Sequence, residues 1–174
     1  WSESWLRVVF THELTHFVQL GMDRGPFAAA SKLFGADVAM GSAIFLPGWM
    51  VEGAAVNLET LLTRGGRGRS ALFELYAKAP VLEGDLFSLR QAGYDSAFPP
   101  EGRIYVAGHV LLDHVLTEYG PDALARIMEA YLRFPFFGPW AAIEKVTGKK
   151  ASAVYADMVQ ALATTPGALP LLQF

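Results

Sequence analysis

The sequence predicts a single, mainly α-helical domain. Its 174 residues suit one domain. Hydrophobic residues make up 52% and aromatic residues 13% of the chain, which is enough for a packed core and excludes intrinsic disorder. Apolar residues recur at spacings of three and four, and glycine and proline interrupt them. We therefore expect residues 1–174 to form helices joined by short irregular connections.

Charge and cysteine content exclude several function classes. Fourteen Lys and Arg against seventeen Asp and Glu give a formal net charge of −3, so no positive field favours a nucleic-acid partner. The longest charge-free windows, 38–51 and 158–174, contain glycine and proline and fall short of the about 18 residues of a membrane helix. No membrane span is expected in this segment. Cysteine is absent, which excludes disulfides, thiolate metal ligands and thiol nucleophiles.

In the first third of the chain, two helices are predicted around a less regular segment. The first covers residues 5–20, because its apolar and histidine residues share one helical face. That face comprises Trp5, Val8, Val9, His12, His16 and Leu20. Residues 33–48 mix small and apolar side chains, which predicts at most a short extended stretch and no helix. The next helix is expected from Trp49 to about Thr63, after the Pro47-Gly48 pair.

Glycine and proline also separate the helices of the remaining chain. Residues 64–69 form a glycine-rich loop, whose arginines we expect to be solvated. Ser70 is predicted to cap a helix, and Pro121 to occupy the first position of another, directly after Gly120 ends the one before it. A tail rich in proline and glycine closes the chain. The predicted helices of this part cover residues 70–78, 104–119, 121–134, 140–147 and 152–163.

The first helix carries an HExxH sequence, His12-Glu13-Leu14-Thr15-His16. Histidines four residues apart lie one above the other on a helix, so both imidazoles can bind one zinc ion. Zinc lowers the pKa of a bound water to about 7, and an adjacent carboxylate can accept its proton during attack on a carbonyl. Glu13 is placed for that role. The alternative interpretation is two buried histidines with ordinary hydrogen bonds.

Two histidines leave a zinc site one protein ligand short. The metzincin continuation would need glycine and histidine where Gln19 and Met22 stand, which excludes that class. Glu52 lies in the apolar start of the second helix, with no basic residue nearby in sequence to pair with it. Because a buried carboxylate is costly unless it is paired or metal-bound, Glu52 is the predicted third ligand. An exposed glutamate in a first helical turn is the alternative.

These residues resemble the gluzincin zinc metallopeptidases of the peptidase MA clan. The second motif, Pro47-Gly48-Trp49-Met50-Val51-Glu52-Gly53, is similar to the P-x-W-x-x-E-G sequence of bacterial peptidase-MA-like domains. The resemblance extends over roughly residues 1–125. It implies a zincin-like helical catalytic domain that hydrolyses peptide bonds with a zinc-activated water. It assigns His12, His16 and Glu52 as zinc ligands and Glu13 as general base.

The resemblance also implies parts that this segment does not contain. Zincins place a β-sheet before the HExxH helix, whose edge strand pairs with substrate, and only eleven residues precede His12 here. We therefore expect a longer protein with further domains, in which the sheet lies upstream. An extracytoplasmic or secreted location is the one that the family favours, although the sequence itself carries no localisation signal. The expected partner is a peptide or protein substrate.

Three further residues are candidates for supporting roles. Gluzincins use a Tyr or His beyond the Glu ligand to stabilise the oxyanion; Tyr105 matches that position, and His109 lies one turn further along. Thermolysin-like enzymes carry an acidic residue where Val56 stands. Glu59, on the same face as Glu52, is the candidate partner of a ligand histidine, and a surface glutamate is the equal alternative.

Two other functions fit the same motifs. One is a non-catalytic zincin-like module that binds a peptide or a neighbouring domain, although the intact Glu13 argues against it. The other is a zinc hydrolase of a non-peptide amide or ester, which the shape of the pocket would decide.

Overall fold

The computed structural model describes residues 5–22, 24–94 and 102–165, and these residues are mainly helical, with no strand among them. The predicted class is confirmed. The α-helices are α1 (Trp5–Leu20), α2 (Gly25–Phe34), α3 (Gly48–Leu62), α4 (Ala71–Glu83), α5 (Arg103–Tyr119), α6 (Ala123–Arg133), α7 (Gly138–Thr147) and α8 (Ala151–Thr164). Short 3-10 helices are η1 (Ala36–Phe45), η2 (Arg67–Arg69), η3 (Gln91–Gly93) and η4 (Pro135–Phe137).

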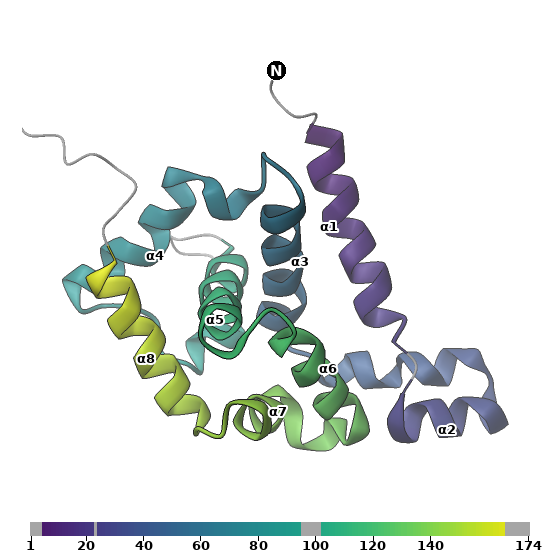
Figure 1. Ribbon diagram of the computed structural model, residues 1–174. Helices are drawn as coiled ribbons and strands as arrows, with labels where there is room; N and C mark the ends of the chain where they lie inside the picture. Colours follow the sequence, from purple (N-terminus) through teal and green to yellow (C-terminus); the bar gives the residue numbers. More distant parts are fainter. Residues whose placement is uncertain (1–4, 23, 95–101, 166–174) are drawn as a thin grey trace, which may run out of the picture.

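Helix α5 lies at the centre of the molecule, next to α3 (Figure 1). The two helices touch where Gly53 faces Gly108, because neither residue has a side chain to separate the backbones. Around them, α6, α7 and α8 enclose a core in which the rings of Trp49 and Trp140 stack at 4.6 Å. The largest fully buried side chains of this core include Trp49, Met50, Leu111, Leu112, Ile127, Tyr131, Leu132, Ile143 and Met158.

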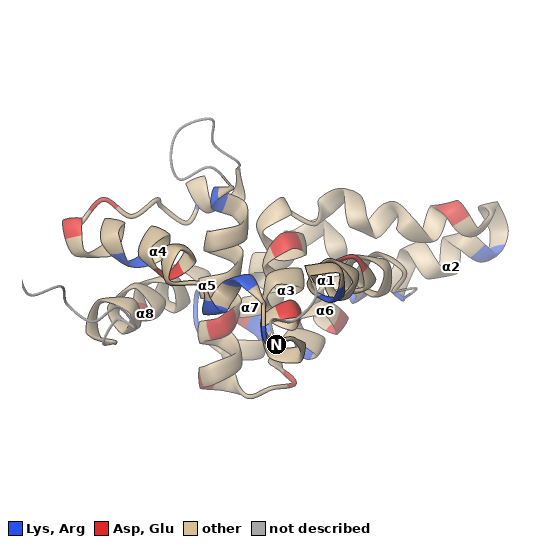
Figure 2. Ribbon diagram, turned by 90° about the horizontal axis from the view of Figure 1, so that it is seen from above, with Lys and Arg blue, Asp and Glu red and all other residues tan. Residues whose placement is uncertain are grey.

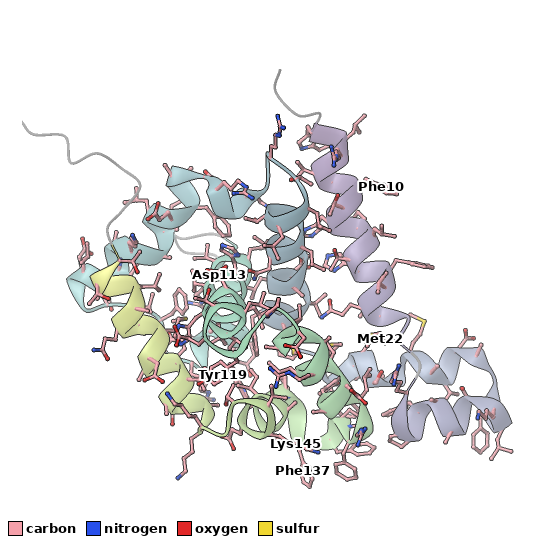
Figure 3. The ribbon with its side chains drawn as sticks, viewed as in Figure 1. Phe10, Met22, Asp113, Tyr119, Phe137 and Lys145 are labelled. Atoms are coloured by element: carbon pink, nitrogen blue, oxygen red, sulfur yellow. The ribbon has the colours of Figure 1, made fainter. Side chains whose placement is uncertain are left out.

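Helix α1 packs along α3 with one side and leaves its other side uncovered within the described residues. His12, Thr15 and Gln19 are its buried residues, and the Gln19 side chain donates to the carbonyl oxygen of Met50 on α3. Phe10 and Phe17 are exposed, and Figure 3 shows Phe10 directed away from the other helices. Contacts with α3 are therefore what mainly hold α1 to the body.

The prediction for residues 33–48 is wrong. This region ends one helix, α2, and contains a second, η1, which pack against each other with a turn at Gly35 between them. Gly35 has φ of 103°, a conformation that glycine adopts without strain. The small residues that argued against a helix allow this close packing: a Cβ on Gly41 would lie 2.5 Å from the Phe27 ring. Figure 2 shows the pair extending away from the other helices.

Several predicted boundaries also change. Helix α4 continues through Pro80 to Glu83, beyond the expected end at residue 78, and ends at Gly84 in the left-handed conformation. Pro121 precedes α6, which begins at Ala123, so proline is not at its first position. Ser70 occupies the N-cap of α4 without a capping side-chain bond. The predicted tail after Thr165 lies outside the described residues.

Among the described residues, no single helix is long and apolar enough to cross a membrane. The bent pair Ala36–Phe45 and Gly48–Leu62, at 98° to each other, reaches the required length and apolar composition together. Most of the second helix is buried inside this molecule, however. Its apolar composition is therefore accounted for by the core.

Candidate metal centre

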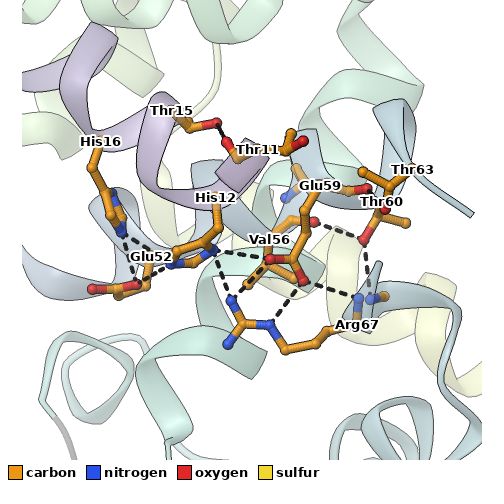
Figure 4. A network of polar contacts seen from close by, with 12 residues as sticks. Thr11, His12, Thr15, His16, Glu52, Val56, Glu59, Thr60, Thr63 and Arg67 are labelled. Carbon is orange, nitrogen blue, oxygen red and sulfur yellow. Dashed lines mark hydrogen bonds and ion pairs between the residues drawn. The ribbon is translucent and has the colours of Figure 1, made fainter. Parts of the chain in front are cut away.

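Two helices bring three potential metal ligands together. His12 and His16 project from successive turns of α1, and Glu52 projects from the first turns of α3 (Figure 4). The Nε2 atoms of the two histidines lie 3.0 Å apart. Oε2 of Glu52 lies 3.2 Å from Nε2 of His12 and 3.4 Å from Nε2 of His16. The predicted ligand set therefore converges on one point.

These separations fit a tetrahedral metal ion. Ligand atoms at about 2.1 Å from zinc, at tetrahedral angles, lie about 3.4 Å from one another. Glu52 Oε2 is buried, and the two imidazole nitrogens are within 3.4 Å of it. When both histidines present unprotonated nitrogens, as metal ligands do, this carboxylate oxygen needs a cation beside it. Within the described residues, His12, His16 and Glu52 are the group that could hold a metal ion. The nitrogen and oxygen donors present are ligand types that zinc accepts.

Glu59 contacts the His12 ring at Nδ1, the nitrogen that does not face the other potential ligands. Its Oε2 lies 3.0 Å from Nδ1 of His12, and its side chain is 1% exposed. When Nε2 of an imidazole faces a metal, the proton resides on Nδ1, where it donates to a carboxylate. Of the two interpretations of Glu59, the buried partner of a ligand histidine is therefore the one that the geometry supports. Thermolysin-like enzymes have an acidic residue at the position of Val56. In this chain Glu59, three residues later on the same helix, is the carboxylate that contacts His12.

Arg67 of η2 fixes the Glu59 carboxylate in place. Its backbone N–H and Nε donate to Oε1 at 2.9 and 2.8 Å, and Nη2 donates to Oε2 at 3.0 Å. Nη2 also lies 2.8 Å from Nδ1 of His12. Because both groups are donors in the metal-binding tautomer, Glu59 is the acceptor they share. The expectation of solvated arginines agrees with the exposed Arg64 and Arg69, but it is wrong for Arg67, which is half-buried and bound to Glu59.

The charges of these groups depend on their contacts. Burial lowers the pKa of His12, but the contacts with Glu52 and Glu59 outweigh it and raise that pKa to about 9. Burial raises the pKa of Glu59, whereas bonds from His12 and Arg67 prevail and lower it to about 2. The pKa of Glu52 is lowered in the same way by the two histidines, against the effect of burial. Both carboxylates are therefore anionic at neutral pH, as a cation site requires.

An open cavity of about 540 Å³ borders the metal-binding atoms. Glu13 directly follows His12 on α1, is exposed, and lines this cavity. Glu13 and the metal-binding His12 therefore border the same space. The remaining lining residues are Trp5, Val8, Val9, His12, Glu59, Gly65, Arg67 and Tyr105.

The two candidate oxyanion donors lie in different places. Tyr105 lines the same cavity as Glu13, with its ring centroid 6.5 Å from that of His12 and 5.0 Å from the guanidinium carbon of Arg67. His109 lines a second cavity, between α4, α5 and α8, where it packs against Phe73. The structure therefore brings Tyr105, and not His109, to the metal-binding residues.

Sequence reasoning missed the role of Arg67 because its contacts depend on how the glycine-rich loop folds. Gly68 fits against the His109 ring, where a Cβ would lie 2.5 Å from Nε2. The Gly68 N–H donates to Thr60 Oγ1 at 3.0 Å. The one signal in the sequence was the flanking of Arg67 by glycines, which permits a close approach of the backbone.

Comparison of the chain with protein-family models, curated proteins and solved structures gave no significant match.

Proposed function

We propose that this chain is the catalytic segment of a zinc-dependent peptidase. The observation that carries the proposal is the meeting of two α1 imidazoles and one α3 carboxylate at 3.0–3.4 Å, beside a cavity lined by Glu13. Zinc held by such a set supplies a Lewis acid that activates water and polarises a carbonyl. His12, His16 and Glu52 would hold it.

Glu13 performs the proton transfers in this proposal. At the cavity wall, its side chain accepts the proton of the attacking water and later donates it to the leaving amine. Among the described residues that line this cavity, the other carboxylate is Glu59, which is engaged by His12 and Arg67. Glu13 is therefore the general base.

Tyr105 is the oxyanion donor in this proposal. It faces the same cavity from α5, and the nearby Arg67 guanidinium favours negative charge at that wall. A donor that bonds the oxyanion more strongly than the ground-state carbonyl accelerates the chemical step.

Metal content is the first test. Protein purified without added metal should contain about one zinc per chain by elemental analysis, and Glu52→Ala should lose it. Glu83→Ala, a change at an exposed glutamate of α4, is the matched control and should keep zinc. Equal zinc in the Glu52→Ala protein would remove Glu52 from the ligand set.

Hydrolysis of a mixed peptide library is the second test. Glu13→Gln should keep zinc and lower turnover roughly 10²–10⁴-fold, because glutamine keeps the shape but cannot accept the proton. Glu83→Gln should behave as the wild type. A zinc-loaded wild type that binds peptides without cleaving them would instead support a binding module, and cleavage of esters alone would support the non-peptide hydrolase.

A further inference from the structure

Helices α2 and η1 form an arm, Gly25–Phe45, that contributes almost nothing to the core. The only buried residue of the two helices is Ser42. Large apolar side chains on the arm face outward instead: Leu33 is 82%, Phe34 77% and Ile44 81% exposed. Lys32 and Asp37, on either side of the turn at Gly35, are its charged residues, and the rest is drawn tan in Figure 2.

The serine hydroxyls and the turn of the arm are hydrogen-bonded within the arm. The hydroxyl of Ser31 donates to the carbonyl of Ala28 at 2.9 Å, and the hydroxyl of Ser42 to the carbonyl of Ala39. At the turn, the N–H of Gly35 donates to Ser31 and that of Val38 to Gly35. A protein interface normally makes a hydrogen bond for every 100–200 Å² or so, and the arm offers few groups for that. Such a surface instead suits hydrocarbon, where every backbone group must be satisfied internally.

The base of the arm is fixed and aromatic. The Phe27 ring lies 6.2 Å from that of Phe45 and 5.8 Å from that of Phe136, on η4. The Tyr131 hydroxyl donates to the Ser42 carbonyl. Phe136 and the neighbouring Phe137 are themselves exposed, and phenylalanine is one of the residues that the apolar face of an interfacial helix inserts into a bilayer surface. The arm therefore does not fold back onto the body to cover its apolar side chains.

The length of an apolar helix limits the roles that it can have. Apolar segments of about 10–14 residues are core helices, signal segments or segments lying in a membrane interface. The arm is not in the core, and its helices of 10 residues each are too short to span. We propose that the arm docks this protein onto the surface of a lipid bilayer, with Leu33, Phe34 and Ile44 among the acyl chains. Lys32 and Asp37 remain at the headgroups.

Vesicle co-sedimentation tests this proposal. The chain should bind unilamellar vesicles of phosphatidylcholine alone, and high salt should leave binding nearly unchanged because apolar burial, not charge, drives it. The variant Phe34→Ser/Ile44→Ser should lower the partition constant by about tenfold or more. The control is Leu72→Ser/Leu82→Ser, which removes two exposed apolar side chains of α4, on the opposite side of the molecule (Figure 1); it should bind as the wild type.

Three results would overturn the proposal. They are no binding of the wild type to vesicles, equal loss in the two double variants, and a concentration-dependent dimer that only the arm variant abolishes. The last would assign the arm to a second copy of the chain. Because the substituted residues are exposed, folding should be intact, and circular dichroism verifies it. Vesicle binding does not depend on peptidase activity, so either proposal can fail alone.

Discussion

His12 has a defined partner at each ring nitrogen. Nε2 faces the metal-binding point with His16 and Glu52, and Nδ1 faces Glu59. Arg67 in turn holds Glu59 by three hydrogen bonds. A histidine oriented in this way loses less freedom when it binds a metal, and its basicity rises. The loop that carries Arg67 is therefore part of the metal centre, although it supplies no ligand.

Substitutions of Glu59 and Arg67, on the Nδ1 side of His12, should weaken zinc binding without removing a ligand. We expect Glu59→Gln and Arg67→Met each to lower zinc affinity about 10–100-fold, because the Nδ1 partner is neutralised or released. Competition with a chromophoric chelator measures the affinity. Arg90→Met, at an exposed arginine beside η3, is the control and should retain wild-type affinity. Unchanged zinc affinity in both variants would mean that His12 is oriented by α1 alone.

Tyr105 and His109 should differ in their effect on rate. Tyr105→Phe should lower kcat and kcat/KM together by about 10²–10³-fold while KM and zinc content stay near wild type. His109→Ala should leave kcat per folded molecule nearly unchanged and lower stability, because His109 is buried against Phe73 and Gly68. Steady-state kinetics with a peptide that the wild type cleaves distinguishes the two residues. The reverse pattern would transfer the oxyanion role to His109.

At the scale of elements, zinc should join α1 to α3. Two ligands lie on α1 and one on α3, and the outer side of α1 is exposed within the described chain. We expect zinc to slow amide hydrogen exchange in α1, since opening of this helix would then require loss of the metal. Exchange measured by mass spectrometry should show no such protection in Glu52→Ala. If zinc slowed exchange in α1 of Glu52→Ala as much as in the wild type, zinc would not join α1 to α3 through Glu52.

The attachment of η1 to α6 should weaken in alkali. Burial raises the pKa of Tyr131 to about 12, and its hydroxyl donates to the Ser42 carbonyl. The folded state thus holds the proton more tightly than the unfolded state, whose pKa is near 10. Stability should therefore be full below pH 10 and fall as pH rises from 10 to 12. Tyr131→Phe should reduce that fall in denaturant titrations, and an unchanged pH slope would refute it.

The elements that the sequence predicted are those with strong local signals. Helices α1, α3 and α5 follow from apolar spacing and from glycine or proline at their ends. Of the three potential metal ligands, the two histidines follow from their spacing on α1, and Glu52 follows from its place in the apolar start of α3 and from the motif around it. The arm was missed because its small and apolar residues carry no helical periodicity, and their helical state depends on packing between α2 and η1. Arg67 was missed because its contact with Glu59 arises only when the 64–69 loop folds back over α3.

For the whole molecule, the crossing of α3 and α5 positions the site. Glu52 and Glu59 lie on α3, and Tyr105 lies on α5. The crossing is fixed by the two facing glycines and by Asn57, whose amide donates to the carbonyls of Gly53 and His109. The distance between these helices therefore sets where Tyr105 lies relative to Glu52 and Glu59.

Gly108→Ala should accordingly disturb both fold and site. A Cβ there would lie 1.9 Å from the carbonyl oxygen of Trp49 and 2.7 Å from the Cα of Gly53, and these backbone atoms cannot turn aside. Alanine favours an isolated helix by about 1 kcal/mol over glycine, yet forced separation of packed elements costs about 1–3 kcal/mol or more. We expect a net loss of stability in urea and a lower kcat, as Tyr105 moves away from the metal. Gly93→Ala, whose nearest new contact is the Trp49 ring at 3.8 Å, is the control and should change neither. If Gly108→Ala instead gained the stability that helix propensity alone predicts, the two helices would not be in contact at this crossing.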